Sequence, residues 1–235
     1  GVPRNSEQAV KWYRIAAEQG YAAAQRYLSV MYYYGDGVPQ NYKQAEKWSR
    51  LAAEQGYAPA QKNLGILYIK GEGVPQDDAE AAKWFRLAAE QGNAAAQNNL
   101  AGLYYDGLGV PQDYAEAAKW YRLAAEQGDV RAQNSLGWMY ANGRGVTQDY
   151  AEAVRWYRMA AKQGDAWAQN NLGWMYDNGT GIPQNFSRAI RWYRLAAQQG
   201  NASAQFNLGV VFYNGKGVAQ NNTNAYILWN LAASQ

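Results

Sequence analysis

The chain has 235 residues, of which 48% are apolar, and its 22 basic and 19 acidic residues give a net charge of +3. This length permits one or two globular domains, and the longest apolar stretches are too short to cross a bilayer. The absence of cysteine and histidine excludes a disulfide framework and a thiol nucleophile. No acidic pair stands out from the general pattern of the chain either, so we expect no catalytic, metal or cofactor site.

A glycine recurs every 36 residues along the whole sequence, at Gly20, Gly56, Gly92, Gly128, Gly164 and Gly200. Repetition at this period is typical of solenoids, in which each unit buries its apolar face by stacking on its neighbours. The sequence therefore predicts a single repeat domain over 1–235, taken from a longer array. It consists of a half repeat at 1–20, whose Gly1-Val2-Pro3 matches the middle of later copies, and six repeats at 21–56, 57–92, 93–128, 129–164, 165–200 and 201–235.

The first helix of each unit is predicted from the copy at 93–128. Asn93 is a favourable N-cap, a role that Asp129, Asp165 and Asn201 repeat in later units. Ala96, Leu100 and Leu103 form one apolar stripe. Paired glycines at Gly107 and Gly109 then end the helix in a tight loop.

The second helix of the unit begins after that loop. Asp113 followed by Glu116 predicts a capping box, which recurs as Asp77 with Glu80 and as Asp149 with Glu152. Ala117, Trp120, Tyr121 and Ala124 form its buried stripe, and Gly128 ends it. We expect the whole tryptophan column to be core: Trp12, Trp48, Trp84, Trp120, Trp156 and Trp192.

Close packing of helices is predicted from a column of small residues, Gly65, Ala101, Gly137, Gly173 and Gly209. We expect these to face the aromatic column three residues further on, Tyr68, Tyr104, Tyr140, Tyr176 and Phe212. An invariant glutamine column is predicted to form hydrogen-bonded brackets between units: Gln25, Gln61, Gln97, Gln133, Gln169 and Gln205.

The basic residues also follow the repeat. One column is Arg14, Arg50, Arg86, Arg122, Arg158 and Arg194, and glutamates stand four residues later at Glu18, Glu54, Glu90 and Glu126. Residues at this spacing are neighbours on a helix, so the pattern predicts local charge compensation on a solvated outer face. This interpretation argues against nucleic-acid binding.

Taken together, the motif of the unit resembles the Sel1-like repeat family, relatives of tetratricopeptide repeats. The residues that carry the resemblance are Ala168-Gln169, Leu172-Gly173, Met175-Tyr176, Gly179 and Gly181, with Trp-Tyr and Ala-Ala pairs in the second helix. The resemblance implies an all-α, right-handed α-solenoid superhelix of helix-turn-helix repeats. It further implies an adaptor, as in bacterial signalling, envelope and host-interaction proteins, with a peptide or protein as its partner.

Candidate binding residues are sought where a first-helix column varies and points away from the core, on the surface expected to be concave. The tenth position of the unit changes from Val30, Ile66 and Gly102 to Trp138 and Trp174, and Trp167 stands at the third position. Exposed tryptophans are typical binding anchors. Packing between helices is the alternative explanation.

The sixth and seventh positions are rich in asparagine, at Asn63, Asn98, Asn99, Asn134, Asn170, Asn171 and Asn207. Amides suit the pinning of a peptide backbone, and contact with a neighbouring repeat is an equally open alternative. Arg26 and Lys62 at the sixth position suggest a ligand that is acidic at one end.

Two alternatives to a peptide-binding adaptor remain. One is a receptor for a small ligand or glycan that stacks on the exposed tryptophans. The other is a spacer or an oligomerisation surface, with end-to-end self-association through exposed apolar end faces. The sequence does not decide the compartment, so a periplasmic or secreted location and a cytoplasmic one both remain open.

Overall fold

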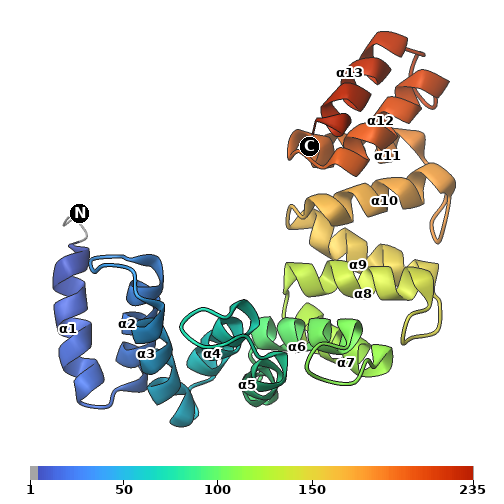
Figure 1. The fold of residues 1–235 in the computed structure, drawn as a ribbon. Helices are drawn as coiled ribbons and strands as arrows, with labels where there is room; N and C mark the ends of the chain where they lie inside the picture. Colours follow the sequence, from blue (N-terminus) through green and yellow to red (C-terminus); the bar gives the residue numbers. More distant parts are fainter. Residues whose placement is uncertain (1–4, 235) are drawn as a thin grey trace. The chain divides into compact units, whose positions relative to one another are not determined.

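The computed structural model describes residues 5–234, which form thirteen α-helices and no strand. Residues 1–4 and 235 lie outside this description, and with them the match of Gly1-Val2-Pro3 to later copies. Consecutive helices pair in antiparallel fashion along the chain (Figure 1). Their bounds are α1 Ser6–Glu18, α2 Ala22–Tyr34, α3 Tyr42–Glu54, α4 Ala58–Lys70, α5 Asp78–Glu90, α6 Ala94–Asp106, α7 Tyr114–Glu126, α8 Val130–Asn142, α9 Tyr150–Lys162, α10 Ala166–Asn178, α11 Phe186–Gln198, α12 Ala202–Asn214 and α13 Asn222–Ala233.

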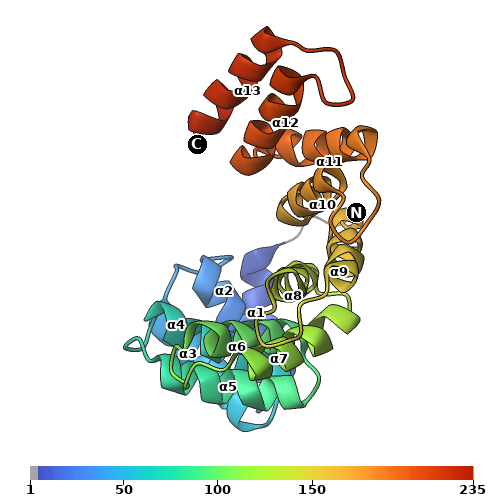
Figure 2. The ribbon, with the colours of Figure 1, turned by 90° about the vertical axis from the view of Figure 1, so that its right-hand side faces the viewer.

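The chain divides into two compact units, one ending at Trp120 and the other beginning at Tyr121, within α7. In the first unit each helix from α1 to α5 packs against the next one, and in the second unit each helix from α8 to α12 does the same. Figures 1 and 2 show this succession within each unit. Each unit is therefore described by itself below.

Both ends of the first helices are as predicted. The side chains of Asn93, Asp129, Asp165 and Asn201 accept hydrogen bonds from the backbone N–H three residues later, which confirms the N-caps. At the other end, Gly107 has a φ of 70° and donates its N–H to the carbonyl oxygen of Leu103 at 2.9 Å. This left-handed conformation costs glycine little and satisfies a free carbonyl at the helix end.

The second glycine of each loop has a further role that the sequence alone did not suggest. A Cβ atom on Gly109 would lie 2.2 Å from the backbone carbon and oxygen of Asp78, at the start of α5. The loop after α6 thus rests directly on the second helix of the preceding repeat. Only a residue without a side chain permits this approach.

The capping box is confirmed in one half and wrong in the other. Asp77 Oδ1 accepts the backbone N–H of Glu80 at 2.9 Å, as predicted. However, the N–H of Asp77 donates to the carbonyl oxygen of Tyr68 at 3.1 Å, so it is not left for the Glu80 side chain. Glu80 instead forms a salt bridge with Lys83. Asp113 with Glu116 and Asp149 with Glu152 follow the same arrangement.

The small-residue column does face an aromatic column, but a different one from that predicted. A Cβ atom on Gly173 would lie 2.7 Å from the ring of Tyr193, which belongs to the second helix of the same unit. Gly65, Gly137 and Gly209 lie against Phe85, Tyr157 and Trp229 in the same way. The partner is therefore 20 residues away in sequence, because the two helices of a unit cross at this point.

The tryptophan column is core with one exception. Trp48 and Trp156 are buried, and Trp84, Trp120 and Trp192 are partly buried against the core clusters. Trp12 on α1 is 67% exposed, so its assignment to the core was wrong. Within residues 5–234 no helix precedes α1 to cover this face.

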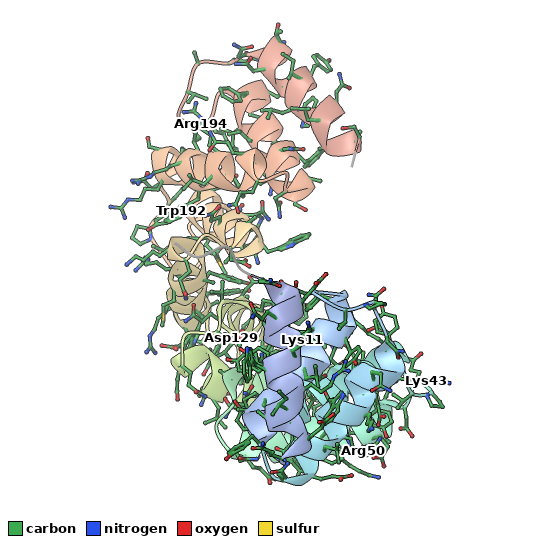
Figure 3. All side chains as sticks on the ribbon, turned by 90° about the vertical axis from the view of Figure 1, so that its left-hand side faces the viewer. Lys11, Lys43, Arg50, Asp129, Trp192 and Arg194 are labelled. Carbon is green, nitrogen blue, oxygen red and sulfur yellow. The ribbon has the colours of Figure 1, made fainter. Side chains whose placement is uncertain are left out.

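The prediction that the arginine column pairs with glutamates four residues later is also wrong. Among residues 5–234, five of the six arginines instead donate to a tyrosine hydroxyl on the following helix: Arg14, Arg50, Arg86, Arg122 and Arg158. Arg50 Nη2 donates to Tyr68 OH at 2.8 Å, and its salt bridge is with Glu46, four residues earlier. Arg194, labelled in Figure 3, lies over the ring of Phe212 instead, where the hydroxyl is missing. Lys43, on the same helix as Arg50, extends away from the ribbon.

The glutamine brackets are confirmed. Gln25 Nε2 donates to the carbonyl oxygen of Ala17 at 3.1 Å, and Gln55 Nε2 donates to Gln25 Oε1 at 2.8 Å. One buried side chain on α2 thus links the last turn of α1 to the C-cap residue of α3. Equivalent bonds surround Gln61, Gln133 and Gln169.

Candidate functional site

The predicted binding residues fall on the first helices of both compact units. Arg26 lies on α2, and Trp138 on α8. The remaining residues are Lys62 and Asn63 on α4, Asn98 and Asn99 on α6, Asn134 on α8, and Trp167, Asn170, Asn171 and Trp174 on α10. These residues are therefore described below as two groups, one on each compact unit.

Three exposed indoles lie on the first helices α8 and α10 of the second compact unit. Trp138 is 37% exposed, Trp174 is 45% exposed and Trp167 is 60% exposed. Asn142 Nδ2 donates to the carbonyl oxygen of Trp138 at 2.8 Å, and Asn178 Nδ2 donates to that of Trp174 at 2.9 Å. At both tryptophans of the tenth position, the backbone carbonyl thus accepts the same hydrogen bond from an asparagine four residues later.

A hydrogen bond places these tryptophans on one surface. Asn171 Nδ2 on α10 donates to Asn134 Oδ1 on α8 at 3.3 Å. Trp138 follows Asn134 by four residues and Trp174 follows Asn171 by three, so each indole lies one turn beyond this contact on the same helix face. Trp167 is seven residues before Trp174 and shares its face. We call Trp138, Trp167 and Trp174 the tryptophan surface.

The asparagines take part in contacts between repeats. Besides the bond between Asn134 and Asn171, Asn207 Nδ2 donates to Asn170 Oδ1 at 3.0 Å. Asn98 and Asn170 are buried, whereas Asn63 and Asn99 are partly buried. One of the two open alternatives, contact with a neighbouring repeat, is thus realised for Asn134, Asn170 and Asn171. Peptide binding by this column stays a prediction.

The chemistry of the tryptophan surface is that of apolar contact. Asp177, three residues after Trp174, is buried, and its Oδ1 accepts from Lys216 Nζ at 3.5 Å.

Within the described residues no group of three or more His, Cys, Asp or Glu side chains would hold a metal ion. The described helices also lack the length and apolar character needed to cross a membrane.

In the first compact unit, the repeat at 21–56 departs from the pattern of the other repeats in a way that the sequence analysis did not detect. Where four other repeats pair a glycine with an aromatic ring, α2 carries Ser29 and α3 carries Ser49. Both serines are buried, and their Oγ atoms lie 2.6 Å apart. Ser29 Oγ also donates to the carbonyl oxygen of Ala45 at 2.7 Å. A buried polar pair therefore replaces a ring.

A cavity of about 280 Å³ lies at this point, between α2, α3 and α4. We call it the serine pocket. Its lining consists of the two serines at the base, apolar and tyrosine walls, and a polar rim: Ser29, Val30, Tyr33, Tyr34, Ser49, Lys62, Asn63, Ile66, Leu67 and Lys70. Of the residues predicted from sequence, Lys62 and Asn63 are part of this lining, and Arg26 is not.

The rim of the serine pocket carries a linked pair of titratable groups. Lys70 Nζ donates to Tyr33 OH at 2.6 Å, and the ammonium lies 3.8 Å from Glu72 Oε2. The hydrogen bond to Tyr33 raises the pKa of Lys70, and burial raises the pKa of Tyr33. Lys70 therefore keeps its positive charge, and Tyr33 its proton, throughout the neutral range.

The described helices define an all-α protein built from stacked helix-turn-helix repeats. The Sel1 repeat model matches residues 1–21, 22–57, 58–93, 94–129, 130–165, 168–201 and 202–235. The chain therefore belongs to the Sel1 repeat family, as the resemblance implied. Sel1 repeats form non-catalytic scaffolds, and the proteins that carry them generally act in protein–protein interaction.

Solved structures agree with this assignment. A protective antigen of uropathogenic Escherichia coli that displays an SLR fold is 44% identical, with a TM-score of 0.90 over 96% of this chain and 48% of that chain. A Sel1 repeat protein of Oxalobacter formigenes is 36% identical, with a TM-score of 0.83 over 97% and 96% of the two chains. The present chain thus spans about half of the Escherichia coli antigen.

A more distant likeness concerns the fold alone. An immunity protein of Pseudomonas aeruginosa is 21% identical, with a TM-score of 0.51 over 97% of this chain and 79% of that chain. The comparison with curated proteins gave no match.

Proposed function

We propose that this chain is a protein-interaction scaffold that binds a peptide or partner protein through the exposed faces of its first helices. The observation that carries the proposal is the tryptophan surface, where two indoles at one repeat position remain exposed on neighbouring helices. Tryptophan is enriched among residues that dominate binding energy, because its large ring buries much apolar area. The absence of His and Cys supports a role without catalysis.

The surroundings of the indoles favour a polypeptide as the occupant. Asn171 lies between Trp167 and Trp174 along the same face of α10, at spacings of four and three residues. An amide offers two donors and an acceptor, so groups beyond its single bond to Asn134 would serve the backbone of an extended peptide. Apolar side chains of that peptide would pack against the rings.

The test is selection of peptides from a random phage-displayed library on the wild-type protein, followed by fluorescence polarisation with variants. We expect Trp138→Ala/Trp174→Ala to weaken the selected peptides at least tenfold, since both anchors are lost. Tyr150→Ala is the matched control, because Tyr150 is a similarly exposed aromatic residue on α9, a second helix of the same unit. Its affinity should equal that of wild type.

Two results would contradict the proposal. One is unchanged affinity of the selected peptides for the double variant. The other is a failure to select any peptide together with binding of an immobilised oligosaccharide that is lost in Trp138→Ala/Trp174→Ala. The latter result would favour the glycan receptor, in which sugar rings stack on the indoles.

A further inference from the structure

The serine pocket arises from a single break in the packing pattern of the repeat. In four other repeats a glycine on the first helix lies against a ring of the second helix. A Cβ atom on that glycine would lie between 2.5 and 2.8 Å from the ring. The ring fills the space between the helices there. Ser49 supplies only a hydroxymethyl group at the same place, and the pocket of about 280 Å³ includes this position.

The interior of the serine pocket suits an aromatic ring. Val30, Ile66 and Leu67 provide apolar walls, and the rings of Tyr33 and Tyr34 meet edge to face with centroids 4.8 Å apart. An apolar cavity of roughly 150 Å³ is enough to hold benzene. The serine hydroxyls at the base are satisfied by each other and by Ala45, so covering them with a ring strands no polar group.

The rim of the serine pocket selects for negative charge. Lys62 and Lys70 both line it. The Glu72 carboxylate, outside the lining, lies 3.8 Å from Lys70 Nζ and offsets one of these two positive charges, so a net positive charge remains at the rim. An ammonium has three donors, and Lys70 directs one to Tyr33 OH at the edge of the pocket. A carboxylate at this rim would accept a charge-assisted hydrogen bond, which is stronger than a bond between neutral groups.

We propose that the serine pocket is a docking site for an aromatic side chain of a partner polypeptide, with a carboxylate next to the ring held by Lys62 and Lys70. The partner ring would take the place that Phe85 and its equivalents occupy in the other units. This inference rests on the proposed function in that the occupant is a polypeptide. The serine pocket lies in the compact unit that ends at Trp120, whereas the tryptophan surface lies in the unit that begins at Tyr121. Variants in one unit therefore test one proposal without testing the other.

The first experiment is an NMR titration of the 15N-labelled protein with N-acetylphenylalanine, which combines a phenyl ring with a free carboxylate. We expect saturable shifts of amide signals in α2 and α4, with a dissociation constant in the millimolar range. N-Acetylphenylalaninamide has the same ring without the charge and should bind at least fivefold more weakly. Absence of saturable shifts, or equal binding of the two compounds, would overturn the proposal.

Variants then locate the site. Ser29→Gly/Ser49→Phe places a phenyl ring against a glycine inside the pocket, as Phe85 lies against Gly65 in the next repeat. This variant should bind N-acetylphenylalanine at least tenfold more weakly, and its thermal midpoint should be at or above that of wild type. Lys70→Gln keeps the cavity and should weaken N-acetylphenylalanine severalfold without changing the affinity for the amide. Undiminished binding to the filled variant, or equal effects of Lys70→Gln on both compounds, would refute the assignment.

Trp138→Ala/Trp174→Ala separates this proposal from the proposed function. Because both substitutions lie in the second unit, N-acetylphenylalanine should bind this variant as it binds wild type. Loss of its binding there would place the aromatic site on the tryptophan surface and overturn the assignment to the serine pocket.

Discussion

Residues of one type have opposite roles in this chain, depending on the column in which they stand. Trp156 on the second helix α9 is buried, whereas Trp138 on the first helix α8 is exposed. The indole of Trp156 is part of the packing of its unit, and that of Trp138 leaves much of its area to solvent. Their contributions to stability should differ accordingly.

We expect Trp156→Ala to lower the free energy of unfolding by about 3–5 kcal/mol, because a large buried side chain is removed and a cavity remains. Trp138→Ala should cost less, about 1–2 kcal/mol, since 37% of this residue is already exposed. Chemical denaturation followed by circular dichroism gives both values. Equal losses in the two variants would show that Trp138 is a core residue.

Buried phenols give a second prediction at this scale. Burial raises the pKa of Tyr157 and Tyr193 well above the ordinary value of 10.0. Above pH 10 the unfolded chain loses these protons and the folded chain keeps them, so stability must fall as pH rises. Below pH 10 both states hold the protons and the effect vanishes. Since the chain has no histidine, we expect a nearly flat thermal midpoint between pH 6 and 9.

Thermal melts from pH 6 to 11 test this expectation. The fall of the midpoint above pH 10 should be shallower in Tyr157→Phe/Tyr193→Phe than in wild type, because phenylalanine has no proton to lose. Identical slopes for the two proteins would assign the alkaline loss of stability to other groups.

At the scale of the helix, the start of each second helix depends on one side chain rather than on a reciprocal pair. Asp149 Oδ1 accepts from the backbone N–H groups of Ala151 at 2.9 Å and Glu152 at 3.0 Å. The N–H of Asp149 is bonded to Tyr140, and the Glu152 side chain pairs with Arg155 at the surface. The cap and the glutamate are therefore energetically separate.

We expect Asp149→Ala to cost about 0.5–2 kcal/mol, the usual loss when an N-cap is removed. Glu152→Gln should cost less than about 0.5 kcal/mol, because an exposed ion pair contributes little. Urea denaturation of the two variants measures the difference. An equal loss of unfolding free energy in Glu152→Gln and Asp149→Ala would contradict this prediction and favour a reciprocal capping box.

The successes and errors of sequence reasoning follow from how far apart the partners are. Helix bounds, caps and glutamine brackets were predicted because each depends on local chemistry repeated at every unit. Arg50 was assigned a glutamate four residues later and Gly65 an aromatic residue three residues later, whereas their actual partners, Tyr68 and Phe85, lie across a loop. Spacing along one helix does not reveal such contacts.

The same limit applies to the candidate sites. Trp138 and Trp174 were found because they depart from their own column on an outward face. The serine pocket was missed because its signal requires two columns to be read together. Ser49 is unusual only once the second helix is known to place a ring against the small residue of the first.

At the scale of the whole molecule, apolar side chains are exposed on the helices at either end of the described chain. Trp12 and Ile15 are exposed on α1, and Tyr226, Ile227 and Leu231 are exposed on α13. Exposed apolar patches of this kind favour association. They are the surfaces through which we predicted end-to-end contact.

We therefore expect reversible self-association as the protein concentration rises, measured by sedimentation equilibrium. Ile15→Lys and Ile227→Lys should each reduce the association constant at least tenfold, because burial of a charge opposes the contact. A strictly monomeric wild type across the concentration range would contradict the prediction. Unchanged association in both variants would place the contact elsewhere.

The glutamine bracket has a consequence for how such a chain changes its length. Each bracket joins a side chain to positions 8 residues before and 30 residues after it, and every partner recurs in the next copy. A duplication or deletion of one whole period brings identical partners together again, whereas a change of any other length in a helix breaks a buried joint. The architecture therefore accepts growth and loss only in whole repeats, and single copies, such as the one with the serine pair, are free to specialise.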